Sequence, residues 1–255
     1  MSGSLSKAMR KTSIEWTDWT WNPVTGCLSR CSYCYNLRPG SLLGRFGAVY
    51  IENGKTYTET LNWRKRETGK IHVASKGERI PYGYDPTFYP HRLEEPIKRR
   101  KPAKIFVCDC ADLWGDWIPN EWIEEVLKVV KMCPQHTFQL LTKNPKRYLD
   151  FELPDNSWAG TTVTCNKDYG RALIMKKVKA PIRFLSIEPL LGEVTFPFDN
   201  IQWIIVGAQT GRNPLRPKKE WVEKILSNAQ KQGIPIFLKN NLRLYYPPSI
   251  QEFPL

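Results

Sequence analysis

The chain has 255 residues, which is long enough for one large α/β domain with its own hydrophobic core. An odd number of cysteines, seven, argues against the disulfide framework of a secreted protein. Neither a signal peptide nor a stretch of membrane-spanning length is evident. We therefore expect a cytoplasmic protein without a membrane partner. The formal net charge of +13 favours a polyanionic partner such as nucleic acid, because each phosphate contact gains from counterion release.

Three cysteines near the start of the chain, Cys27, Cys31 and Cys34, have the spacing C-x3-C-x2-C and follow a tryptophan-rich run. Thiolates are the soft ligands that iron–sulfur clusters select. Three thiolates this close together can hold three irons of a cubane [4Fe–4S] cluster and leave the fourth iron without a protein ligand. An outside molecule can bind that open iron and receive an electron. The spacing therefore predicts a [4Fe–4S] cluster at these three residues.

A structural zinc site is the alternative interpretation of the same cysteines. Zinc needs four ligands and usually takes them from pairs of C-x2-C, and the chain has one such pair, at 31–34. A fourth ligand would come from one of the remaining cysteines, which are Cys108, Cys110, Cys133 and Cys165.

The stretch 38–90 has no helical period. Two strand-like runs at 48–52 and 55–60 flank Asn53-Gly54, which is the strongest short hairpin signal. Between residues 38 and 104 the chain has fifteen Lys and Arg against seven Asp and Glu, so this part carries eight of the thirteen net positive charges. Basic grooves with stacking rings suit nucleic acid, so we expect 38–90 to recognise the substrate, in particular through Trp63, Arg64, Lys65 and Arg66.

After residue 100 the chain alternates strand-like and helix-like runs. Helices are predicted over 120–132, with Asn120 as N-cap, and over 218–232, with Gly233 as the stop. Strands are predicted over 105–108, 137–142, 158–164, 182–187, 201–206 and 234–238. This alternation implies parallel pairing and right-handed crossovers, hence an α/β fold with a partial (β/α) barrel of about six or seven parallel strands. We expect one domain over 1–255, with 38–90 inserted over the barrel mouth.

Polar residues follow most of the predicted strands. Chemistry in (β/α) barrels sits at the C-terminal ends of the strands, so these residues are candidates for catalysis or binding. His136, which directly precedes a predicted strand, is interpreted as structural instead. In chain order the candidates are Cys108, Asp109, Cys110, Asp112, Lys143, Thr162, Thr164, Asn166, Glu188, Gln209 and Lys239.

Tyr33, immediately before Cys34, completes the pattern C-x3-C-x-aromatic-C, and there the chain resembles the radical S-adenosylmethionine superfamily. Within it the chain is similar to a phage-associated family long catalogued as a domain of unknown function. One departure follows Tyr35, where relatives usually continue directly into a helix. The similarity spans most of the chain and rests on IEWTD (14–18), TWNPVTGC (20–27), QHTFQLLTK (135–143), RFLSIEPLLG (183–192) and WIIVG (203–207).

The resemblance implies that the cluster cleaves S-adenosylmethionine reductively to methionine and a 5′-deoxyadenosyl radical, which then takes a hydrogen atom from the substrate. An external donor such as flavodoxin or ferredoxin would supply the electron. Related barrels bind the methionine amino group at the end of the second strand, where the carboxylate of Asp109 or Asp112 suits an ammonium. The resemblance thus implies three catalytic candidates, which are Lys143, Glu188 and Lys239, and Gln209 is expected to bind the substrate. The expected cofactor-binding residues are Tyr33, Cys108, Asp109, Cys110, Asp112, Thr162, Thr164 and Asn166.

The function predicted from the sequence is therefore radical chemistry on a nucleic-acid base or on a group attached to a base, with DNA favoured over RNA. Phage association suggests DNA hypermodification in the host cytoplasm, for example by rearrangement of an amino-acid-derived group. A radical enzyme acting on a free nucleotide or a peptide is one alternative. A zinc-stabilised nucleic-acid-binding module without catalysis is the other.

Overall fold

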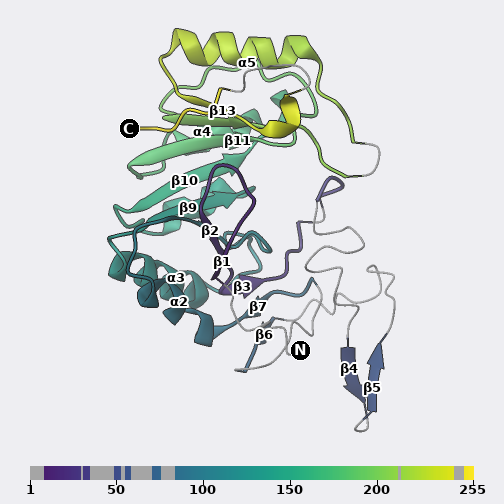
Figure 1. Ribbon diagram of the computed structural model, residues 1–255, viewed down its shortest axis with the longest axis vertical. Helices are drawn as coiled ribbons and strands as arrows, with labels where there is room; N and C mark the ends of the chain where they lie inside the picture. The colour runs from purple at the N-terminus through teal and green to yellow at the C-terminus, as the bar shows by residue number, and fades with distance from the viewer. Residues whose placement is uncertain are drawn as a thin grey trace.

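The computed structural model describes residues 9–29, 31–34, 49–52, 55–58, 71–75, 84–211, 214–243 and 250–255. Its centre is an eight-stranded sheet in the order β1-β2-β8-β9-β10-β11-β12-β13 (Figure 1). All neighbours from β2 to β13 pair in parallel, and only β1 is antiparallel. The strands are β1 (Met9–Lys11), β2 (Trp19–Trp21), β8 (Lys104–Val107), β9 (Thr137–Thr142), β10 (Ser157–Thr162), β11 (Ile182–Ile187), β12 (Trp203–Val206) and β13 (Ile236–Leu238).

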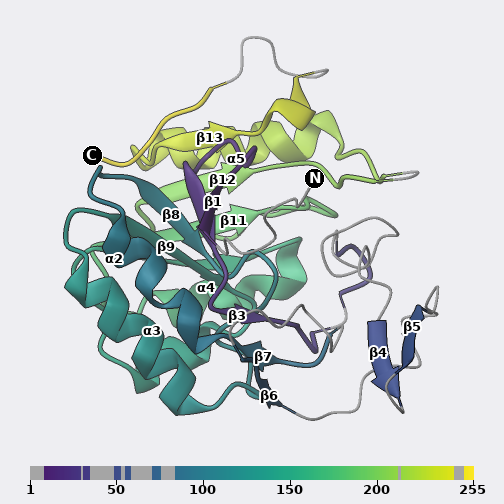
Figure 2. The same cartoon turned by 60° about the horizontal axis from the view of Figure 1, so that its bottom comes forward.

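Seven parallel strands confirm the predicted partial barrel. Within the described ranges no strand pairing joins β13 to β1 or β2, so the barrel is open on that side. Helices α2 (Glu94–Lys98), α3 (Asn120–Met132), α4 (Tyr169–Met175) and α5 (Lys219–Lys231) lie outside the sheet (Figures 1 and 2). Among the residues that the structure describes, none forms a helix with both the length and the apolar character needed to cross a membrane.

Most predicted elements are present, and the differences have local causes. The strand expected over 158–164 ends at Thr162, because the amide and hydroxyl of Thr164 both donate to the carboxylate of Asp168 at 2.7 Å and begin a turn. The last strand begins at Ile236 instead of 234, after Pro235, which has no N–H to donate. The prediction of Asn120 as N-cap is wrong, since Pro119 occupies that position and Asn120 is the first residue of α3.

The expected hairpin is present, because β4 (Val49–Glu52) and β5 (Lys55–Thr58) pair antiparallel with Glu52 opposite Lys55. Figures 1 and 2 show it apart from the eight-stranded sheet. A second small sheet joins β3 (Val24–Thr25) to β7 (Thr87–Phe88), which also pairs with β6 (His72–Val73). The expectation that 38–90 covers the barrel mouth stays a prediction, and residues 63–66 lie outside the described part of the chain.

Aromatic rings fill the interior of the barrel below the C-terminal ends of its strands. Trp16 packs 4.8 Å from Phe106 and 6.3 Å from both Phe184 and Trp203, measured between ring centres. These four residues and Phe237 are buried, and we call them the aromatic floor. Gly160 of β10 makes room for it, because a Cβ atom at that position would overlap the ring of Phe184. The cavity lined by the described residues lies on the side of the floor toward the C-terminal ends of the strands.

Residues from both ends of the sequence cover the open side of the barrel. The carboxylate of Glu15 accepts a hydrogen bond from the amide of Asn240 at 2.7 Å, just past β13, and a longer one of 3.3 Å from the side chain of Gln251. Phe253 stacks on Trp203 with ring centres 5.4 Å apart. We call this group of contacts the seam. It joins the segment between β1 and β2 to the far edge of the sheet without strand pairing.

Candidate active site

A cavity of about 480 Å³ lies at the C-terminal ends of the parallel strands, above the aromatic floor. This is a typical volume for a small-molecule site. The C-terminal ends of the six strands from β8 to β13, or the residues that follow them, contribute to its wall, together with residues 10–16 and the cysteine-bearing segment 27–34. The position agrees with the rule that (β/α) barrels carry their chemistry at this end.

Strand periodicity explains which side chains reach the cavity. Successive residues of a strand point to opposite faces, so residues that are two apart share a face. Phe184 in the aromatic floor is followed on its face by Ser186 and then by Glu188, and both of these line the cavity. In the same way Phe237 is followed by Lys239, which lines it as well.

All three cysteines of the C-x3-C-x2-C motif line this cavity, and each is partly buried. The amide of Cys34 donates to the carbonyl of Cys31 at 3.0 Å, which gives the loop a tight turn. Gly26, directly before the motif, donates its amide to the carbonyl of Cys110 at 3.1 Å and has a φ of 84°. A Cβ atom there would overlap the backbone carbonyl of Asp85, so the anchor of the cysteine loop to the end of β8 requires glycine.

The three thiols are not gathered into a single-ion site, and a cubane cluster does not require that they are. Within the described ranges, no three His, Cys, Asp or Glu side chains form a group that could hold one metal ion. In a cubane the three thiolates bind three different irons, so they surround the cluster instead of meeting at one point. Burial, followed by the negative charge of Asp112, raises the pKa of the Cys27 thiol. A positively charged group bound there would favour the thiolate.

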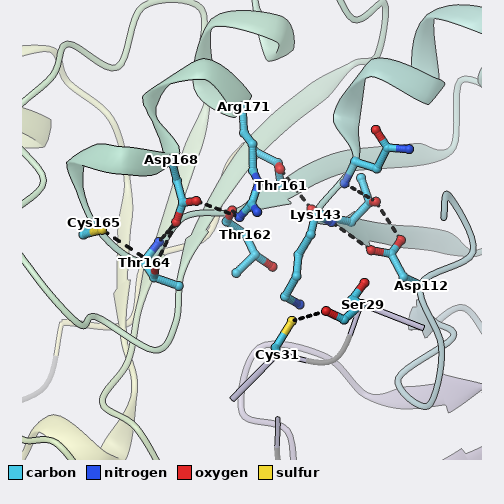
Figure 3. Close-up of polar contacts among 12 residues, drawn as sticks. Ser29, Cys31, Asp112, Lys143, Thr161, Thr162, Thr164, Cys165, Asp168 and Arg171 are labelled. Carbon is cyan, nitrogen blue, oxygen red and sulfur yellow. Dashed lines mark hydrogen bonds and ion pairs between the residues drawn. The ribbon is translucent and has the colours of Figure 1, made fainter. Parts of the chain in front are cut away.

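Asp112 supports the ends of two strands. Its buried carboxylate accepts hydrogen bonds from the Thr142 hydroxyl at 2.6 Å and from the Lys143 amide at 3.0 Å (Figure 3). The Lys143 side chain extends from this point toward the loop that carries Ser29 and Cys31. Its ammonium lies 5.9 Å from the centre of the Tyr33 ring. Lys143 forms no ion pair with another residue of the described part, so its charge is available to a ligand.

Asp109 already has partners within the protein, and the two cysteines beside it are buried. The Asp109 carboxylate accepts a hydrogen bond from the Asn22 side-chain amide and lies 3.5 Å from the guanidinium of Arg10. Burial raises the pKa of the Cys108 thiol to about 12, and burial also raises the pKa of Cys110. Cys108 has a φ of 61°, which is uncommon for a residue other than glycine. All three line the cavity, as predicted from their place after β8.

Glu188 and Lys239 form an ion pair across the cavity wall. In the sheet register Ile187, Val206 and Leu238 stand side by side, so Glu188 and Lys239 follow on either side of Gly207. A Cβ atom on Gly207 would lie 2.9 Å from Cδ of Lys239 and 3.1 Å from Cδ of Glu188. A methyl group at this position would therefore displace both side chains of the pair.

The structure does not bring every predicted residue to the cavity. Thr162 and Gln209 line it, whereas Thr164 and Asn166 do not. Thr164 is held by Asp168, which also pairs with Arg171 at 3.0 Å (Figure 3). The Asn166 side chain donates a hydrogen bond to the hydroxyl of Thr195 at 3.1 Å, and its oxygen accepts one from the Thr195 amide at 2.9 Å.

Sequence reasoning missed Arg10, Ser186 and Gly207. Arg10 lines the cavity but precedes every motif, so nothing in the sequence marks it. Ser186 lies on the face of β11 that carries Glu188, and the period of the strand could have identified it. The role of Gly207 depends on two residues in other strands and is visible only in the structure.

Comparisons with known proteins agree with this fold. Over 92% of its length the chain is similar to a variant of spore photoproduct lyase, covering 79% of that chain with a TM-score of 0.53 and 8% identity. A second variant of the same enzyme, with bound AdoMet and dinucleoside spore photoproduct, has a TM-score of 0.48 and 10% identity over 96% of this chain and 65% of that one. At such identities the likeness concerns the fold alone, which is an open (β/α) barrel.

The curated proteins contain no sequence match to this chain. A family model described as a protein of unknown function (DUF5131) matches residues 11–243 and thus covers most of the sequence. The match includes the cysteine motif and every strand of the parallel sheet. The chain therefore belongs to the DUF5131 family, as its sequence motifs predicted.

Proposed function

We propose that this protein is a radical S-adenosylmethionine enzyme that modifies a nucleic-acid base or a group attached to one. The observation that carries the proposal is the placement of Cys27, Cys31 and Cys34 on one wall of the cavity at the C-terminal ends of the barrel strands. A cluster held by these thiolates faces the space in which a substrate and S-adenosylmethionine would meet.

Cys27, Cys31 and Cys34 would hold a [4Fe–4S] cluster through three irons. When bound, the cluster supplies the electron that cleaves S-adenosylmethionine into methionine and a 5′-deoxyadenosyl radical, and a flavodoxin or ferredoxin is the proposed source of that electron. The protein has to orient the reactants and exclude water. The aromatic floor closes the cavity below, and the strand ends provide polar groups around it.

The polar groups divide by charge. Lys143 reaches toward the cysteine loop with an ammonium that no described carboxylate neutralises, so it suits a carboxylate or phosphate of a ligand. Asp109 is already paired with Arg10, so it binds a methionine ammonium only in competition with the guanidinium. Asp112 acts mainly as a support for β9. Thr162 offers a hydroxyl for ribose or substrate.

The proposal of a nucleic-acid substrate rests on charge and space. The net charge of +13 favours a polyanion, and the aromatic and polar residues of the cavity wall suit a base. The finer proposal is a host-cytoplasmic hypermodification of DNA, based on the phage association of similar sequences. A free nucleotide or a peptide is the competing substrate class for the same chemistry.

The test is anaerobic purification followed by iron and sulfide analysis and a visible spectrum. We expect a brown protein that absorbs near ~400 nm with about four irons per chain. The Cys31→Ala variant should lose this absorption. Cys165→Ala is the matched control, because Cys165 is partly exposed and does not line the cavity, and it should keep the cluster.

The loaded protein, given dithionite and S-adenosylmethionine, should release 5′-deoxyadenosine. DNA or RNA treated in the same reaction and digested to nucleosides should then contain a new nucleoside. A colourless protein with one tightly bound zinc, no iron after reconstitution and no S-adenosylmethionine cleavage would overturn the proposal and favour the zinc-stabilised binding module.

A further inference from the structure

The ion pair of Glu188 and Lys239 offers unused hydrogen-bonding groups to the cavity. Lys239 donates to one carboxylate oxygen, Oε1 of Glu188. In the described part of the chain no hydrogen bond reaches the second oxygen, Oε2, and the ammonium of Lys239 has no other acceptor. The Glu188 side chain is 22% exposed and that of Lys239 15%, and both line the cavity.

This arrangement does not suit an anion. The carboxylate of Glu188 already neutralises Lys239, so a phosphate would meet no net positive charge and would be repelled by the remaining carboxylate oxygen. In this respect Lys239 differs from Lys143, although the sequence analysis named both as catalytic candidates at strand ends. The pair presents one acceptor beside donors, and it lies directly against Gly207, where a Cβ atom would crowd both side chains.

A ligand that matches the pair needs a donor and an acceptor side by side on one edge. The trans peptide group does not meet this condition, because its N–H and C=O point in opposite directions. The Watson–Crick edge of every nucleobase does meet it, since ring nitrogens there alternate with carbonyl or amino groups. That edge is accessible only when the base is unpaired, either in a single strand or turned out of a duplex.

We infer that the Glu188–Lys239 pair binds the Watson–Crick edge of an unpaired nucleobase, with Gly207 as its positioning residue. The inference rests on the nucleic-acid substrate of the proposed function and specifies which part of it enters the cavity. Duplex DNA then has to expose the base first, so a single strand should bind more tightly than the duplex of the same sequence.

The experiment measures equilibrium binding of the holoprotein, without reductant, to single strands of about ten nucleotides. The probes are homopolymers of dT, dC and dA, and an abasic strand of the same length, which keeps the phosphates and removes the bases. For at least one base, the wild-type protein should bind the homopolymer about tenfold more tightly than the abasic strand. The duplex form of that homopolymer should bind more weakly than its single strand.

Three variants separate hydrogen bonding from charge. Lys239→Met and Glu188→Gln each remove one member of the pair, whereas Gly207→Ala keeps both charges and displaces them. Each should reduce the preference for the base-bearing strand to near unity. Binding of the abasic strand should be little changed in Gly207→Ala, and in the two charge variants it should change less than binding of the base-bearing strand. Lys224→Met is the matched control, because it removes the same positive charge from an exposed ion pair. Lys224 lies 2.8 Å from Glu193, and neither residue lines the cavity.

Thermal melting establishes which variants are folded, and any folded one of the three suffices for the test. The inference is overturned if the folded variants keep the wild-type preference, if Lys239→Met weakens the abasic and base-bearing strands equally, or if the wild-type protein shows no base-dependent binding. Cleavage of S-adenosylmethionine is assayed separately. A protein that cleaves it but shows no base-dependent binding at the pair retains the proposed function and loses only this inference.

Discussion

The carboxylate of Asp112 and the hydroxyl of Thr142 are joined by a hydrogen bond of 2.6 Å that links the end of β8 to the end of β9. The second carboxylate oxygen accepts the Lys143 amide at 3.0 Å. One buried side chain therefore fixes the backbone from which Lys143 reaches the cysteine loop (Figure 3).

The first prediction concerns Asp112→Ala. The substitution leaves the Thr142 hydroxyl and the Lys143 amide without their acceptor, so we expect the free energy of unfolding to fall by roughly 1–3 kcal/mol. Urea denaturation measures it. Asp116→Asn is the control, because Asp116 is exposed, and its effect should stay within about 0.5 kcal/mol. Equal effects of the two substitutions would contradict the supporting role of Asp112.

The second prediction concerns the aromatic floor. Gly160→Ala would place a methyl group against the ring of Phe184, and overpacking of this kind costs about 1–3 kcal/mol. Gly170→Ala in α4 has open space around the new methyl group and should be neutral or stabilising by up to about 1 kcal/mol. Denaturation of both variants side by side is the measurement. A Gly160→Ala protein as stable as the wild type would show that the floor is loosely packed.

The third prediction is a dependence of stability on pH through His136. Burial lowers the pKa of His136 below 6.5, although hydrogen bonds to the carbonyls of Pro96 and Arg99 oppose the shift. The unfolded chain therefore takes up the proton first, so the contribution of His136 is complete above the unfolded pKa of about 6.5 and is lost as the pH falls below it. Between about pH 7.5 and pH 5.5, His136→Gln should lose less stability than the wild type. Urea denaturation at the two pH values measures the free energy of unfolding, and an equal loss in the variant and the wild type would refute this.

The fourth prediction concerns the seam. Glu15→Ala removes the acceptor, so it should speed hydrogen exchange at the Asn240 amide and lower the free energy of unfolding by about 1 kcal/mol. Glu15→Gln keeps an oxygen in place and should have a smaller effect. Glu124→Ala, on the exposed face of α3, should leave exchange at Asn240 unchanged. The readout is exchange monitored by mass spectrometry, and unchanged protection at Asn240 in Glu15→Ala would mean that other contacts hold the seam.

The sequence predicted the strand ends well because two local signals determine them. Alternation of strand and helix gives the parallel barrel, and the period of two within a strand carries Lys143, Glu188 and Lys239 into the cavity. What the sequence could not predict are contacts between distant segments. Lys239 is neutralised by a residue two strands away, and Arg10 pairs with Asp109 across the sheet.

Thr164 and Asn166 show a different limit. The strand before them was predicted to run to residue 164, but it stops at Thr162 and the chain turns. Asp168 causes this by accepting two hydrogen bonds from Thr164. A single acidic residue a few positions downstream thus decided which hydroxyls face the cavity, and a strand pattern does not contain that information.

The seam has a consequence for the order of assembly. A ribosome releases Cys27, Cys31 and Cys34 early, but Glu15 gains its partners Asn240 and Gln251 only after most of the chain has emerged. Until then the cavity lined by the cysteines lacks the part of its wall that contains Lys239. The complete cavity around the three thiols therefore forms only after the last strand, and any group that needs the complete cavity can be bound only by the finished chain.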